Sequence, residues 1–170
     1  MTEQAATVYF FLTLPILFYV VFTDLRYMRI FNWTNIALFL LFFVPAFFFF
    51  DLWTIAWQIG VAAIVFVVGY LINLVGIMGG GDTKFLPAAT PYVMLNDLDD
   101  TLALMLIFVL ASFSVLIGHR ALLLVPGFRN MVTDWVSWNN PKFSGRPAVP
   151  FGVILAGTLS GYLLIHAFLR

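Results

Sequence analysis

The stretch that decides the fold runs from Trp53 to Met78 and reads WTIAWQIGVAAIVFVVGYLINLVGIM, without one charged residue. A helix needs about 20 consecutive apolar residues to cross the hydrocarbon core of a bilayer, and this stretch is long enough. Four further stretches also qualify as spans, namely Ala5–Thr23, Trp33–Phe50, Leu102–Ile117 and Val149–Leu169. The chain is therefore predicted to cross a membrane several times.

The composition of the whole chain agrees with a membrane environment. Of the 170 residues, 63% are hydrophobic and only 9% are charged, whereas a small soluble domain needs a large polar surface. The net charge of zero gives no basic face, so we expect no nucleic-acid partner. Cysteine is absent, which excludes cysteine-ligated zinc and a thiol nucleophile. These features predict an all-α integral membrane protein with a single membrane-embedded domain over residues 1–170.

A sixth stretch, Thr83–Leu95, is short and contains Pro87 and Pro91. Proline removes a backbone hydrogen bond, so this helix is expected to be shielded by other helices rather than by lipid. A five-span arrangement, with this stretch as a re-entrant segment, is the alternative.

The placement of Lys and Arg favours six spans over five, because cytoplasmic loops collect basic residues. With six spans, one side receives Arg26, Arg29, Lys84, Arg120, Arg129, Lys142 and Arg146, and the other receives Glu3, Asp51, Asp97, Asp99 and Asp100 with a single basic residue, Arg170. We therefore predict a compact bundle of about six transmembrane helices with the basic side cytoplasmic and both termini outside. A cytoplasmic loop follows at about 119–147, where Trp135 and Trp138 are expected either as anchors at headgroup level or as a docking element.

Two aspartates fall at span ends on the predicted cytoplasmic side. Asp24 directly follows the first span, and Asp82 follows Gly79-Gly80-Gly81. Two carboxylates at one membrane depth can share a proton and position a water, as in an aspartic protease. Glycines permit left-handed or extended backbone, so Gly79–Gly81 could offer an extended edge to a substrate. A simple flexible turn would need the same glycines.

Two motifs together carry a family resemblance. Asp24 to Asn32 reads DLRYMRIFN, and Gly79 to Lys84 reads GGGDTK. The first motif follows the first span, and the second motif opens a later one. In this order they resemble the motifs of the type IV prepilin peptidases, which are membrane aspartic peptidases of the GxGD type. The resemblance covers about residues 5–95, and the PAVPFG run from Pro147 to Gly152 also looks like the family's C-terminal part. It implies that Asp24 and Asp82 are the catalytic pair.

The chain also departs from the family pattern. Phe31 stands where many members have proline or a small residue before the Asn. The larger bifunctional members carry paired CxxC motifs and an N-methyltransferase domain, and this chain has neither the cysteines nor the length. It is more similar to the short, peptidase-only branch of tight-adherence (Flp) pilus systems.

The resemblance further implies the substrate, the location and the site. The substrates are prepilin leader peptides, cut at the cytoplasmic face of a prokaryotic inner membrane, with lipid around the protein and without a metal or other cofactor. The oligomeric state is left open. Gly79, Gly80, Gly81, Lys84 and Asn32 are expected to bind substrate or shape the site. Lys84 could anchor to phosphates or bias the charge of Asp82, and Asn32 could cap a helix.

Other functions would use the same residues differently. A membrane channel or transporter could bind a cation through Asp24 and Asp82, since divalent ions take oxygen ligands. A noncatalytic subunit of a pilus or secretion assembly could keep the same fold. His119 and His166 are predicted at opposite membrane faces, which favours structural roles. Asp24 ends a helix and Asp82 begins one, so the helix dipoles favour Asp24 as the protonated partner.

Overall fold

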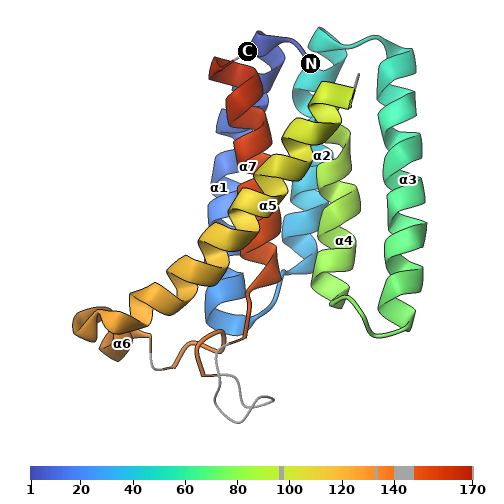
Figure 1. The fold of residues 1–170 in the computed structure, drawn as a ribbon. Helices are drawn as coiled ribbons and strands as arrows, with labels where there is room; N and C mark the ends of the chain where they lie inside the picture. Colours follow the sequence, from blue (N-terminus) through green and yellow to red (C-terminus); the bar gives the residue numbers. More distant parts are fainter. Residues whose placement is uncertain (96–97, 133, 140–147, 170) are drawn as a thin grey trace.

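Five helices are long and apolar enough to cross a membrane, and the described part of the chain has no strand. The computed structural model describes residues 1–95, 98–132, 134–139 and 148–169. The five helices are α1 (Glu3–Tyr27), α2 (Asn32–Phe49), α3 (Leu52–Leu74), α5 (Leu98–Ala121, extended by the 3-10 turn η2, Leu122–Leu124) and α7 (Phe151–Phe168). Figure 1 shows them side by side, with α5 tilted away from the rest. The predicted all-α membrane bundle is confirmed.

The sixth passage through the bundle is made by three short pieces. Helix α4 (Gly80–Ala89) continues into the 3-10 turn η1 (Thr90–Tyr92), and residues 93–95 follow without regular secondary structure. Ten helical residues rise only about 15 Å, half of the hydrocarbon thickness, so α4 cannot cross a bilayer alone. The passage leads from the end where α1 finishes to the end where α5 begins (Figure 1).

Protein rather than lipid surrounds this passage. Helix α4 packs against α2, α3 and α7. Its Phe85 is 1% exposed, and Tyr92 of η1 is fully buried. Pro87 lies inside α4 and Pro91 inside η1, as the shielding argument from the sequence requires.

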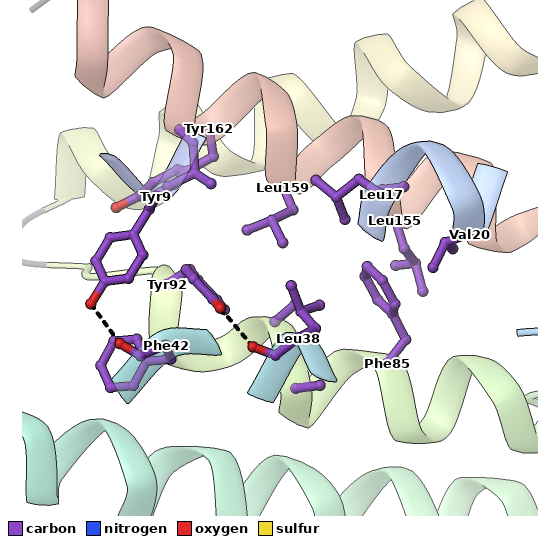
Figure 2. Packing of buried hydrophobic residues seen from close by; sticks show 14 of the residues in the cluster. Tyr9, Leu17, Val20, Leu38, Phe42, Phe85, Tyr92, Leu155, Leu159 and Tyr162 are labelled. Atoms are coloured by element: carbon purple, nitrogen blue, oxygen red, sulfur yellow. Dashed lines mark hydrogen bonds between the residues drawn. The ribbon is translucent and has the colours of Figure 1, made fainter. Parts of the chain in front are cut away.

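Two buried tyrosines, one in η1 and one in α1, form hydrogen bonds to α2. The Tyr92 hydroxyl donates to the Leu38 carbonyl of α2 at 2.6 Å, and the Tyr9 hydroxyl of α1 donates to the Phe42 carbonyl at 2.9 Å (Figure 2). The two rings meet edge to face, with their centroids 5.0 Å apart. A hydroxyl buried in this apolar core needs a hydrogen-bond partner. The two bonds therefore hold α1 and η1 at fixed positions along α2.

The segment after α5 folds back under α1. Helix α6 (Pro126–Met131) comes first, and then the Val136 N–H donates to the Arg26 carbonyl at 2.9 Å. Trp138 stacks on His119 with ring centroids 4.2 Å apart, and its Nε1 donates to the His119 carbonyl at 2.8 Å. Because Trp138 is only 6% exposed, it packs inside the protein, and its prediction as a headgroup-level anchor was wrong.

The charges separate by end of the bundle. The C-terminal ends of α1 and α5, the start of α4, and α6 lie at one end, and they carry Arg26, Arg120, Lys84 and Arg129. The start of α1, the α2–α3 junction and the start of α5 lie at the other end with both termini, and they carry Glu3, Asp51, Asp99 and Asp100 (Figure 1). Lys142, Arg146 and Asp97 lie outside the described residues.

Candidate active site

Asp24 and Asp82 line one cavity at the basic end of the bundle. Its volume is about 490 Å³. Three parts of the chain form it: the α1–α2 connection, the start of α4 and the approach to α7. The lining residues are Asp24, Met28, Arg29, Ile30, Phe31, Asn32, Gly79, Gly80, Gly81, Asp82, Val149 and Phe151. The structure therefore brings together the two carboxylates, all three glycines and Asn32, as the sequence predicts.

The Asp24 carboxylate is held by the first turn of α7. Asp24 lies in the last turn of α1 and is 5% exposed. Its Oδ2 accepts a hydrogen bond from the Val153 N–H at 3.2 Å. A Cβ at Gly152 would lie 2.9 Å from the same oxygen, so a side chain there would occupy the place of the carboxylate.

This contact changes the electrostatic argument made from the sequence. That argument counted only the C-terminal end of α1, which disfavours a negative charge on Asp24. The N-terminus of α7 carries the opposite partial charge and favours the ionised form. The helix dipoles alone therefore do not assign the proton to Asp24.

The Asp82 carboxylate lies at the start of its own helix. It is the third residue of α4, outside the five long helices, and its Oδ2 would be 2.9 Å from a Cβ at Gly79. Asp82 is partly exposed, and burial raises its pKa to about 6. Its negative charge acts on Asp24 across the cavity, as expected for two neighbouring carboxylates.

Gly79 and Gly81 serve close packing, and the three glycines do not form an extended edge. Only Gly79 is extended, with φ −67° and ψ 145°, because Gly80 and Gly81 already belong to the first turn of α4. A Cβ at Gly81 would lie 3.2 to 3.4 Å from atoms of Ile30, whereas one at Gly80 would meet only the Asn73 Nδ2, at 3.9 Å. The predicted strand-like edge over Gly79–Gly81 is therefore absent.

Ile30 joins the two halves of the site, and reasoning from the sequence missed it. It is 7% exposed in the α1–α2 connection. It meets Gly81 on one side, and its Cδ1 would be 2.8 Å from a Cβ at Gly152 on the other. An isoleucine in a short connection could have been noted as a packing residue, but the two glycines that receive it are visible only in three dimensions.

Lys84 and Asn32 form a polar pair at the edge of the cavity. The Lys84 Nζ donates to the Asn32 Oδ1 at 2.8 Å. Asn32 lines the aspartate cavity, whereas Lys84 lines a neighbouring groove that Asn32 also reaches. Of the predicted site residues, Lys84 alone is not part of the cavity lining.

Neither histidine lines this cavity. His119 stacks on Trp138 near the end of α5. His166, near the end of α7, has its Nε2 3.7 Å from Oδ1 of Asp100, and both side chains are buried. The sequence assigns Asp100 only to the acidic side of the bundle and does not indicate that it is buried beside His166.

Comparison with known proteins agrees with the geometry. The model of the type IV leader peptidase family matches residues 11–119, a range that contains Asp24, Asp82 and the three glycines Gly79–Gly81. No curated protein and no solved structure matched the chain. Because the family model covers more than half of the residues, the chain belongs to the type IV leader peptidase family and is a membrane aspartic peptidase.

Proposed function

We propose that Asp24 and Asp82 are the catalytic pair and that the chain cuts leader peptides of Flp-type prepilins at the cytoplasmic face of a prokaryotic inner membrane. The observation that carries the proposal is the shared cavity, which is lined by one nearly buried and one partly exposed carboxylate. Two such groups divide the roles of acid and base between them.

The proposed reaction begins with one proton on the pair. Ionised Asp82 takes a proton from water while the water oxygen attacks the scissile carbonyl carbon, and protonated Asp24 gives its proton to the carbonyl oxygen. Asp82 then protonates the leaving nitrogen as the C–N bond breaks. Asp24 recovers its proton from the tetrahedral intermediate, so both groups return to their starting state.

Exposure supports this division of roles. Asp82 is the more exposed of the two and can receive water from the cavity, whereas Asp24 is 5% exposed. Burial of a carboxylate favours its neutral form, which is the form that donates to the carbonyl oxygen. The bond from Val153 opposes this tendency and also fixes the direction of the Asp24 carboxylate.

The cytoplasmic orientation of the site rests on charge. The cavity lies at the end of the bundle that carries Arg26, Lys84, Arg120 and Arg129. Basic residues next to spans are retained on the cytoplasmic side. The site would then meet a prepilin before its leader is removed, at the point where the apolar segment enters the membrane.

The direct test is cleavage of a synthetic Flp-type prepilin by the purified protein, with and without a chelator. We expect equal rates, because the two carboxylates supply both acid and base. A cation channel or a noncatalytic assembly subunit would leave the prepilin uncut. Cleavage that disappears with the chelator would contradict the two-aspartate mechanism.

A further inference from the structure

A second hollow opens beside the aspartate cavity, between α2 and α3, with α4 also lining it. Its volume is about 570 Å³, and its lining is mostly apolar. We call it the α2–α3 groove. Its lining residues are Asn32, Asn35, Ile36, Phe39, Leu40, Ile59, Ala63, Phe66, Lys84, Pro87 and Ala88.

The groove is continuous with the aspartate cavity. Asn32 lines both, and the Lys84 Nζ is bonded to the Asn32 Oδ1 where they meet. From that junction the lining continues along α2 to Leu40 and along the antiparallel α3 to Ile59. A chain whose peptide bond lies between the aspartates can therefore continue into the groove.

One polar side chain in the lining, that of Asn35, indicates what the groove binds. Asn35 is 5% exposed, and its Nδ2 donates to the Gly81 carbonyl at 3.4 Å. A carbonyl can only accept, so the amide nitrogen must face Gly81 and the Oδ1 must face away. Among the described residues this Oδ1 has no hydrogen-bond partner. A buried acceptor without a donor is costly, so a ligand that brings an N–H would be favoured.

This requirement separates a peptide from a lipid tail. An acyl chain would fill the apolar part but has no donor for Asn35. A peptide helix leaves the N–H groups of its first turn without a partner inside the helix, so the start of an apolar helix brings such donors. Lys84 uses one of its three donors on Asn32 and keeps donors for carbonyls at the junction.

We infer that the α2–α3 groove is the subsite for the apolar segment that follows the scissile bond of the substrate, with Asn35 accepting a backbone N–H of that segment. The inference rests on the proposed function and adds where the enzyme recognises the membrane-embedded part of its substrate.

The first test compares two substrates that share one leader and one scissile bond. The long one keeps the apolar segment, and the short one ends a few residues after the bond. Ala63→Trp fills the groove, and we expect it to raise KM for the long substrate about tenfold or more and KM for the short one less than about twofold. Ile64→Trp is the matched control, because Ile64 is 65% exposed on α3 and does not line the groove.

The results distinguish a failure of this inference from a failure of the proposed function. An equal rise in KM for both substrates, or none for the long one, would overturn the inference while leaving the peptidase intact. If the wild-type protein cuts neither substrate, the proposed function itself fails.

A second measurement does not depend on the folding of the tryptophan variant. The chain has no cysteine, so Ala63→Cys and Ile64→Cys each introduce a single thiol. A long substrate with one cysteine in its apolar segment should form a disulfide with the Ala63→Cys protein and not with the Ile64→Cys protein. No disulfide at either position, or equal yields at both, would mean that lipid occupies the groove and would overturn the inference.

Discussion

At the residue scale, the site depends on small side chains where three elements meet. Gly79, Gly81 and Gly152 each leave no room for a Cβ without displacing a carboxylate or Ile30. The sequence identifies Gly79 and Gly81 as site residues through the GGGD motif. It does not identify Gly152 as a neighbour of Asp24, because the two residues lie 128 positions apart and meet only when α1 packs on α7.

Gly152→Ala tests how Asp24 is positioned. The new Cβ would lie 2.9 Å from the Asp24 Oδ2 and 2.8 Å from the Ile30 Cδ1, both ends of side chains. These ends can move without shifting α7, so we expect near-normal thermal stability and a large loss of kcat. Gly157→Ala is the control, since its Cβ would be 3.7 Å from that of Ala111, an ordinary contact. Full activity in Gly152→Ala, measured by prepilin cleavage, would contradict the positioning role.

The pH dependence of cleavage tests the role of Asp82. As the base it must be ionised, and its pKa is raised to about 6 by burial. The ionised fraction of Asp82 falls as the pH falls through that value, and the proton on Asp24 is lost at higher pH, so kcat/KM should pass through a maximum and decrease about tenfold per pH unit on its acid side. Asp134→Asn changes an exposed residue outside the cavity and should give the same profile. A kcat/KM that still rises as the pH drops from 5 to 4 would assign the base role elsewhere.

At the element scale, the short α4–η1 passage is the feature that the sequence left open. Its length and two prolines suited either a sixth span or a re-entrant segment. The choice depends on long-range contacts, such as the bond from Tyr92 to Leu38 and the packing of α4 among α2, α3 and α7. Hydropathy alone does not contain these contacts, whereas it located all five long helices to within a few residues.

Tyr92→Phe tests how firmly this passage is held. The change removes a buried hydroxyl that donates to the Leu38 carbonyl at 2.6 Å and keeps the ring packing. Hydrogen bonds of this kind contribute about 1 kcal/mol or less within membranes, so the free energy of unfolding should fall by about that amount. Tyr70→Phe, at a ring that is 51% exposed on α3, should change nothing. Unfolding in mixed micelles would measure both, and equal stabilities would contradict the role of the bond.

At the scale of the whole molecule, charge and topology agree. The basic residues of the helix termini lie at one end of the bundle, and the acidic residues Glu3, Asp51, Asp99 and Asp100 lie at the other. Both chain termini lie at the acidic end (Figure 1). The sequence predicts this separation because the positive-inside pattern depends on span order alone. It does not predict the folding of Trp138 against His119 or the burial of Asp100 beside His166, since both depend on packing between distant segments.

Accessibility of single cysteines tests the orientation. Since the chain has no cysteine, one thiol at a time can replace Arg26, Lys84 or Asp99. A membrane-impermeant thiol reagent added to intact cells should label position 99 and spare positions 26 and 84, until the membrane is permeabilised. Labelling of positions 26 and 99 from the same side would contradict the proposed orientation.

The central claim is that Asp24 and Asp82 act as one catalytic unit, and cleavage by the purified Asn variants tests it most directly. Asp24→Asn and Asp82→Asn should each lower kcat/KM by about a thousandfold or more, because an amide cannot exchange the required proton. The double variant should be scarcely slower than either single one, since groups that act as a unit are strongly non-additive. Asp134→Asn should remain active, and all variants should accumulate in the membrane. Full processing of the prepilin by either single variant would contradict the account.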